Sequence, residues 1–164
     1  VVPDDAVLGQ VGAGWIQASN NLSWERLMLT LTSLAGAREV FRDTLRYTGV
    51  REAFGRPIRS LDPVEAMLGE MYTKLVTGEL LAHRCLDLLR SGAECRAEVA
   101  ALKRLVCEEA VWIADRALQL HGGYGYTTEY SPERWWRDLR LMTIGGGTSE
   151  IMANLVAKSR GWMA

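Results

Sequence analysis

A glycine triplet stands directly before a predicted helix start in residues 143–151, TIGGGTSEI. Because glycine has no Cβ, the triplet allows a tight backbone turn and a close approach to a ligand. Unpaired N–H groups at a helix start attract oxygen-rich ligands such as phosphates. The glycine positions themselves carry no acid or base.

Two other polar segments fall where predicted helices end, and both suit an anionic or flat ligand. Residues 119–125, QLHGGYG, combine a helix C-terminus with glycines that let a backbone or a ring system come close. Arg51 offers a planar guanidinium that suits phosphate. Each feature alone has a structural explanation, because glycines commonly cap helices and the REAFG around Arg51 could be a surface turn. Together the three segments favour a ligand site, but they do not identify the ligand.

Helices are the elements that must position these segments. Apolar residues recur at steps of three and four along three long segments, and almost nothing in the sequence is typical of a strand. The first segment is predicted to end near Gly55. The second is predicted to begin with Asp62 as N-cap and Pro63 in its first turn, and to end at residues 91–92. The third is predicted over residues 94–121.

Two shorter helices are predicted after the third segment. Ser131 begins a brief helix that contains Trp135 and Trp136, and Thr148 or Ser149 caps a terminal helix. Long amphipathic helices joined by short connections bury their apolar faces best as an antiparallel bundle. We therefore predict an all-α fold, an antiparallel four-helix-type bundle with a short terminal helix.

Composition excludes several classes of protein. The chain has 164 residues, of which 48% are hydrophobic, and a formal net charge of −1, which fits one domain with a real core. No basic stripe is present for nucleic acid, and no apolar run approaches a membrane span. The three cysteines form no C-x-x-C pair, and with only two histidines we expect no Cys/His zinc site. We expect no nucleic-acid, membrane or metal binding, and a reducing, cytoplasmic setting.

The order and spacing of the motifs resemble the C-terminal half of acyl-CoA dehydrogenases. The resemblance covers the whole chain and depends on R.AFG.PI, QLHGGYGYT.EY..ER..RD.R and IGGGTSEI, which are specific in combination although each alone is weak. It implies an FAD-dependent oxidoreductase that converts an acyl-CoA thioester to a trans-2-enoyl-CoA. A base takes the α-proton while the β-hydrogen leaves as hydride to the flavin. An electron-transfer flavoprotein is the implied electron acceptor.

The resemblance also implies a domain boundary and an assembly. The chain opens with Val1 on VVPDDAVLGQVGAG, which looks like the end of a preceding unit. Residues 1–10 are expected to be the tail of a preceding β domain, and residues 11–164 to form the helical C-terminal domain of a longer protein. Alone, this part is expected to be inactive and to bind FAD weakly or not at all. Because relatives assemble as dimers of dimers, a homodimer or homotetramer is expected.

The resemblance places the catalytic base on the first long helix. Many relatives carry a glutamate in the loop, at the position where this chain has Gly146. A minority, including isovaleryl-CoA and long-chain dehydrogenases, carry it on the helix immediately before an arginine, and here that pair is Glu25 and Arg26 in SWER. We therefore predict Glu25 as the general base, a carboxylate that takes a proton once bound substrate excludes water. The alternative is that Glu25 only supports the helix start, where an acid favours the positive end of the dipole.

The binding residues that the resemblance implies form two sets. Acyl-CoA is expected at Ser23, Trp24, Arg26, Gly146 and Gly147, although Arg26 could instead form a structural ion pair. The FAD of a neighbouring subunit is expected at Arg51, Phe54, Gln119, Leu120, His121, Gly122 and Gly123, and the FAD of the same subunit at Thr148, Ser149 and Glu150. His121 could instead cap its helix. Asp62 stands where many relatives have a glutamine that contacts FAD, and it is left out of the predicted site.

Two alternatives to the dehydrogenase stay open. Related acyl-CoA oxidases and flavin monooxygenases share this bundle, and the reactivity of the reduced flavin with oxygen distinguishes them from dehydrogenases. The chain could also be a non-catalytic helical module whose main role is self-association. The Glu25–Arg26 pair together with the GGGTSE segment favours the dehydrogenase.

Overall fold

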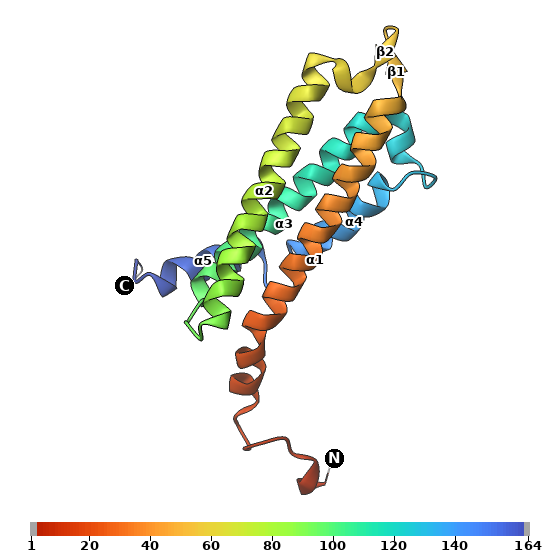
Figure 1. Ribbon diagram of the computed structural model, residues 1–164. Coiled ribbons are helices and arrows are strands. Elements are labelled where there is room, and N and C mark those ends of the chain that lie inside the picture. Colours follow the sequence, from red (N-terminus) through yellow and green to blue (C-terminus); the bar gives the residue numbers. More distant parts are fainter. Residues whose placement is uncertain (1–2, 163–164) are drawn as a thin grey trace.

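The structure is a computed structural model that describes residues 3–162, except for the side chain of Asn20. Residues 1–2 of the expected β-domain tail and residues 163–164 of the expected helical domain lie outside the described residues. The described chain is almost entirely helical (Figure 1). Its elements are η1 (Asp4–Ala6), α1 (Gly14–Val50), β1 (Glu52–Ala53), β2 (Arg56–Pro57), η2 (Ile58–Ser60), α2 (Asp62–Arg90), α3 (Arg96–His121), η3 (Gly122–Tyr126), α4 (Pro132–Met142) and α5 (Ser149–Ser159).

The helices α1 to α4 form a bundle in which successive helices run in opposite directions, and α5 crosses one end of it (Figure 1). Helix α3 is central, because it packs against α1, α2, α4 and α5. The predicted all-α antiparallel bundle with a short terminal helix is therefore confirmed. In the described residues the only sheet is the two-stranded antiparallel hairpin of β1 and β2.

The end of α1 and the start of α2 differ from the predicted ones. Helix α1 ends before the predicted Gly55, because Arg51 already has an extended backbone with φ −73° and ψ 124°. The chain then turns at Phe54 and Gly55, which both have positive φ angles of 54° and 77°, as a tight hairpin turn requires. Helix α2 begins at Asp62 itself with Leu61 at the N-cap position, so the predicted Asp62 cap is wrong.

The ends of α3, α4 and α5 follow the prediction more closely. Helix α3 is followed by Gly122 with a φ of 60°, as expected of a glycine that ends a helix. The Ser131 hydroxyl, which precedes α4, donates to Oδ2 of Asp43 at 2.9 Å and so ties α4 to α1 rather than capping it. Thr148 caps α5, because its Oγ1 accepts a hydrogen bond from the backbone N–H of Ile151 at 3.4 Å.

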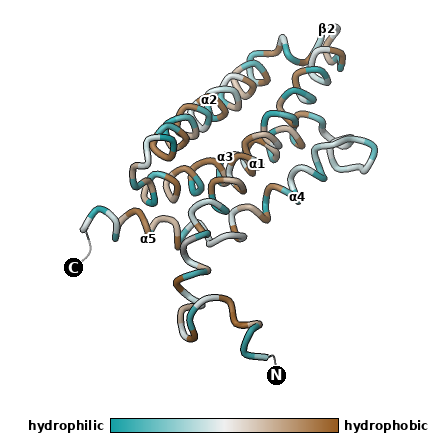
Figure 2. The backbone as a smooth tube through the Cα atoms, turned by 60° about the horizontal axis from the view of Figure 1, so that its bottom comes forward, coloured by the Kyte–Doolittle hydropathy of each residue, from teal (hydrophilic) through white to brown (hydrophobic). Residues whose placement is uncertain are grey.

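Two clusters of buried side chains form the core along the bundle axis. The three long helices are amphipathic, and Figure 2 shows hydrophobic and hydrophilic residues alternating along them. The cluster nearer the hairpin consists of Ala37, Val40, Phe41, Met71, Leu75, Ala110, Ile113, Ala114, Ala117 and Leu139. The other consists of Leu27, Ala82, Cys85, Cys95, Val99, Leu102 and Val106.

The N-terminal turns of α1 extend beyond the rest of the bundle (Figure 1). Trp15, Ile16 and Trp24 on these turns are 78%, 63% and 55% exposed. Glu25 lies well inside α1, which begins at Gly14. Because the helix dipole acts mainly within the first turn, the explanation that Glu25 only supports a helix start is wrong.

Two negative findings apply to the residues that the structure describes. No helix in residues 3–162 is long and apolar enough to cross a membrane. Within the same residues, no three His, Cys, Asp or Glu side chains come together in a group that could hold a metal ion.

Candidate functional site

The glycine triplet and the first third of α1 lie against each other. Nε of Arg26 donates a hydrogen bond to the carbonyl oxygen of Gly146 at 2.9 Å. Burial lowers the pKa of Arg26, and the charge of Arg96 adds to this effect while the Glu25 carboxylate opposes it. The hydrogen-bond partner of Arg26 is thus the loop backbone and not an acidic side chain.

Glu25 lies on the turn of α1 that precedes this contact. It comes four residues before Leu29, so the two side chains share one face of the helix. A Cβ at Gly146 would lie 2.7 Å from Cδ1 of Leu29, which places that face against the loop. Glu25 is exposed, and Nδ2 of Asn21 donates to its Oε1 at 2.9 Å. An exposed carboxylate one residue before the loop-binding Arg26 is therefore available to a ligand that reaches this end of the bundle.

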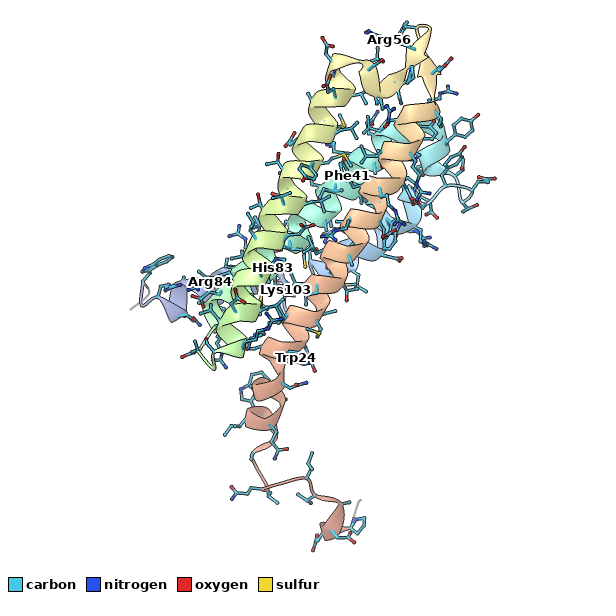
Figure 3. The ribbon with its side chains drawn as sticks, in the orientation of Figure 1. Trp24, Phe41, Arg56, His83, Arg84 and Lys103 are labelled. Carbon is cyan, nitrogen blue, oxygen red and sulfur yellow. The ribbon has the colours of Figure 1, made fainter. Side chains whose placement is uncertain are left out.

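The two other predicted substrate residues of α1 are on the same turn. Ser23 is partly buried, and Trp24 is 55% exposed. Figure 3 shows Trp24 where α1 leaves the bundle, beyond the level of Lys103. The structure thus brings the substrate set of α1 and that of the glycine loop to the same end of the bundle.

Only glycine suits the second and third positions of the triplet. Gly146 and Gly147 have φ angles of 67° and 111°, a region that L side chains rarely adopt. A Cβ at Gly147 would in addition lie 2.8 Å from Cε of Met152. The loop is therefore closely packed as well as conformationally restricted, and it presents no side chain of its own beside Glu25.

Lys103 on α3 is a contact of this loop that the sequence analysis missed. Its side chain is 1% exposed, and its Nζ donates to the carbonyl oxygens of Gly147 at 2.7 Å and Met142 at 3.1 Å. A signal was present in the sequence. Lys103 comes four residues after Val99 and three before Val106, which lie on the apolar three- and four-residue spacing of this segment, so the same periodicity places it inside.

The predicted nucleotide residues come together at the opposite end of the bundle. Arg51, directly after α1, and residues 119–123 line a cavity of about 430 Å³, together with Tyr47, Ile58, Tyr124 and Thr127. Six of the seven residues predicted to reach a neighbouring FAD thus share one cavity. Phe54 is not among the lining residues, and its side chain is 93% exposed at the hairpin turn.

His121 is buried at the base of this cavity. Its Nδ1 lies 2.7 Å from the Ala117 carbonyl oxygen one turn earlier, and its ring stacks on that of Tyr47 with centroids 4.1 Å apart. The Tyr47 hydroxyl donates to the backbone carbonyl of His121 at 3.3 Å. Burial lowers the pKa of His121, while the Ala117 hydrogen bond and Asp43 oppose this. The imidazole is therefore a buried, hydrogen-bonded part of the cavity wall.

Aromatic residues that the sequence analysis did not select also surround this end of the bundle. An adjoining cavity of about 790 Å³ shares Tyr47, Arg51, His121 and Tyr124 with the first. Tyr130 meets Tyr47 edge to face at 5.8 Å, and the Arg51 guanidinium lies 5.9 Å from the centre of the Tyr124 ring. Tyr124 and Tyr130 lie within the GGYGYT.EY motif and Tyr47 lies in the last turn of α1, so the motif itself was a usable signal for two of the three.

The third predicted group lies at the start of α5. Thr148, Ser149 and Glu150 line a cavity of about 340 Å³ with Arg140 and neighbouring residues. A hydrogen bond from Thr148 lowers the pKa of Glu150, and its own backbone N–H, Arg104 and Arg140 act in the same direction. The linings of this cavity and of the Arg51 cavity share no residue. The predicted FAD contacts therefore fall in two separate places.

Comparison with known proteins assigns the chain to a family. The family model described as acyl-CoA dehydrogenase, C-terminal domain, matches residues 12–160. A curated relative, the caffeyl-CoA reductase-Etf complex subunit CarC of Acetobacterium woodii, is 31% identical over 156 residues, which are 95% of this chain and 41% of the relative. The chain thus spans about two fifths of the length of the curated relatives it matches.

Solved structures give the same assignment. The crystal structure of an acyl-CoA dehydrogenase from Geobacillus kaustophilus is similar with a TM-score of 0.94 and 33% identity, over 97% of this chain and 42% of that one. A glutaryl-CoA dehydrogenase from Mycobacterium smegmatis in complex with FADH2 is similar with a TM-score of 0.84 and 29% identity, over 87% of this chain and 37% of that one. The chain belongs to the acyl-CoA dehydrogenase family, of which it carries the C-terminal domain.

Proposed function

We propose that the protein carrying this chain is an FAD-dependent enzyme that oxidises the Cα–Cβ bond of an acyl-CoA thioester to a trans-2-enoyl-CoA. The observation that carries the proposal is the hydrogen bond between Arg26 and Gly146, because it joins the helix of Glu25 to a loop that has no carboxylate. Family membership supports the reaction class. The similar glutaryl-CoA dehydrogenase, which binds FADH2, supports the cofactor.

In the proposed mechanism Glu25 is the general base. Its carboxylate takes the α-proton of the thioester after substrate and the remaining protein exclude water from the exposed turn. Ser23, Trp24 and Arg26 border the substrate from α1, and Gly146 and Gly147 border it from the loop. FAD, when bound, supplies the acceptor for the β-hydrogen. The residues of this chain bind and orient the substrate, and Glu25 removes one proton from it.

The residues around the Arg51 cavity fit part of a flavin dinucleotide. Arg51 supplies a permanent cation for a diphosphate. A Cβ at Gly122 or Gly123 would meet nothing within 4 Å, so a ligand has room to approach the backbone there. The rings of Tyr47 and Tyr124 offer flat apolar surface for a ring system. We propose that Arg51, Gln119, Leu120, His121, Gly122 and Gly123 hold the FAD of a neighbouring subunit, with Phe54 reaching it from the hairpin.

We propose that Thr148, Ser149 and Glu150 contact the FAD of their own subunit. The positive end of the α5 dipole favours an anionic group, and Arg140 adds a cation to the same cavity. Two separate cavities for one kind of cofactor agree with a homodimer or homotetramer that shares FAD across its interface. Light scattering on the full-length protein measures this assembly, and a monomer that still binds FAD fully would contradict it.

The remaining parts of the proposal concern partners and location. The Acetobacterium woodii relative is named as a subunit of an Etf complex, which supports an electron-transfer flavoprotein as electron acceptor. We place the protein in the cytoplasm, since its three cysteines are free thiols. Residues 1–10 as the tail of a preceding β domain remain a prediction.

The decisive experiment is flavin bleaching by a panel of acyl-CoA thioesters in the full-length, FAD-bound protein. Glu25→Gln is expected to slow flavin reduction at least about 100-fold, because it removes the proton acceptor while preserving shape. FAD content is expected to stay unchanged. Glu39→Gln is the matched control, since Glu39 lies 14 positions further along the same helix, in an ion pair with Arg42. Bleaching of the Glu25→Gln variant at the wild-type rate would disprove the assignment.

The reverse direction is a second candidate, because the Acetobacterium woodii relative is named a reductase. In that direction protonated Glu25 gives its proton to the α-carbon of an enoyl-CoA. Mixing the chemically reduced protein with an enoyl-CoA and following the return of the oxidised flavin spectrum measures it. Both directions require Glu25, so the variant pair above tests both.

A further inference from the structure

The buried ammonium group of Lys103 is not explained by the proposed chemistry. It lies at the level where α1, α3 and the glycine loop meet (Figure 3), and its side chain is 1% exposed. Burying a charge is costly, and an apolar side chain of similar volume often stabilises a core better. Burial accordingly lowers the pKa of Lys103, as does the charge of Arg26, with Cys107 opposing. A lysine at this position therefore needs a reason other than packing.

Its contacts indicate that reason. The shorter of its two hydrogen bonds, 2.7 Å, goes to the carbonyl oxygen of Gly147 inside the glycine loop. The other, 3.1 Å, goes to Met142 at the end of α4. A cation near the end of a helix is favourable in itself, but that would account only for the Met142 contact. The Gly147 contact lies beyond α4 and fixes the loop.

Lys103 and Arg26 hold neighbouring peptide groups from different helices. Arg26 of α1 holds the carbonyl of Gly146, and Lys103 of α3 holds that of Gly147. Hydrogen bonds from ionised donors are stronger than neutral ones. Without them, two adjacent glycines with unrestricted backbones have many alternative conformations. The loop conformation therefore depends on two cations that reach it from two sides.

We propose that Lys103 is a positioning residue that holds the glycine loop at a set distance from the Glu25 turn of α1. The inference rests on the proposed function for its catalytic consequence, because the loop then borders the thioester whose α-proton Glu25 removes. Lys103 itself touches neither substrate nor cofactor. Its effect is transmitted through the Gly147 carbonyl.

The test compares Lys103→Met with wild type in the full-length, FAD-bound protein by hydrogen exchange and by flavin bleaching. Methionine keeps much of the side-chain volume and removes both donors. Amide exchange in a peptide covering residues 143–149 is expected to become about tenfold faster, as the loss of a charge-assisted hydrogen bond implies. The bleaching rate at saturating acyl-CoA is expected to fall by a similar factor of about ten, with unchanged FAD content.

Met71→Ala is the control for a loss of stability without a change at the loop. Met71 is fully buried in the cluster nearer the hairpin and does not belong to the loop contacts. It is expected to lower the unfolding temperature while exchange at residues 143–149 keeps its wild-type rate. Wild-type exchange of this peptide in Lys103→Met, or an equal increase in Met71→Ala, would overturn the proposal.

Two further variants keep the test decisive. Lys103→Arg retains a cationic donor and is expected to lie closer to wild type in loop exchange than Lys103→Met. If Lys103→Met yields no folded protein, Lys103→Gln replaces it, because the shorter uncharged amide must also release the loop. If none of the acyl-CoAs bleaches the flavin of the wild-type protein, the proposed function fails. The exchange rate of the loop peptide still decides the role of Lys103.

Discussion

Nε of Arg26 and the carbonyl oxygen of Gly146 are joined by a hydrogen bond of 2.9 Å across 120 positions of sequence. The bond connects the part of α1 that carries Glu25 to the loop between α4 and α5. Arg26, which follows the candidate base in sequence, is therefore linked directly to the backbone of the glycine loop. Changes on either side of this bond are expected to affect both.

Replacing Gly146 by alanine is expected to destabilise the domain by about 1–3 kcal/mol, because of its φ of 67° and the 2.7 Å approach of its Cβ to Leu29. Gly145→Ala is the matched control. A Cβ there would lie 3.7 Å from the Leu141 carbonyl oxygen, in ordinary contact. Urea unfolding of both variants measures the difference. Equal stability of the two would show that the loop adapts to a side chain.

Arg51→Ala is expected to weaken FAD binding about tenfold or more, because it removes the cation of the 430 Å³ cavity. Arg56→Ala is the control, since Arg56 lies in the same hairpin region and outside the cavity lining. Titration of the full-length apoprotein with FAD, followed by flavin fluorescence, gives both dissociation constants. Unchanged affinity in Arg51→Ala, or equal losses in both variants, would exclude this cavity as a cofactor site.

Acidification is expected to destabilise the wild type more than a His121→Gln variant. Burial lowers the pKa of His121 below its ordinary 6.5, so between the two values the unfolded chain binds a proton that the folded chain does not. This contribution to the free energy of unfolding is complete above pH 6.5. It is lost as the pH falls toward the pKa of His121 in the folded protein. Urea unfolding of both proteins at about pH 7.5 and about pH 5.5 measures it. A wild-type loss no larger than that of the variant would contradict the buried neutral imidazole.

The three thiols are expected to react slowly with alkylating reagents while the domain is folded. Burial raises the pKa of Cys85 to about 11, with Cys95 and Glu98 adding to the effect. Burial also raises the pKa of Cys95 and of Cys107. At about pH 8, only about one Cys85 in a thousand is then a thiolate. Mass spectrometry after iodoacetamide treatment, with and without urea, tests this, and rapid native labelling would be the contrary result.

Much of the architecture could be predicted because it depends on local patterns. The stripes of α1, α2 and α3 follow from three- and four-residue spacing, and Thr148 caps α5 as its side chain suggests. The bounds near the hairpin could not be read in this way. Phe54 has a positive φ that aromatic residues rarely adopt, so nothing local separated the end of α1 from the turn that follows.

The residues of the candidate site that lie in sequence motifs could be predicted. Those that belong to it only through tertiary contacts could not. Glu25, Arg51 and the glycine triplet stand in recognisable segments. Lys103 was not selected from the sequence, because lysines are rarely buried, although its spacing within an apolar stripe places it inside. Leu45 lies on the three- and four-residue spacing of α1, which suggests an inward position, but it is 38% exposed. Periodicity shows on which face of a helix a side chain lies. Whether that face is buried depends on the neighbouring helices.

The exposed position of Glu25 on the turns of α1 beyond the bundle has a consequence for how the protein matures. Water surrounds this carboxylate until other protein segments and a substrate enclose it. Under the proposed function, proton removal then requires the complete assembly, and a copy that lacks part of it is expected to show no flavin reduction rather than slow reduction.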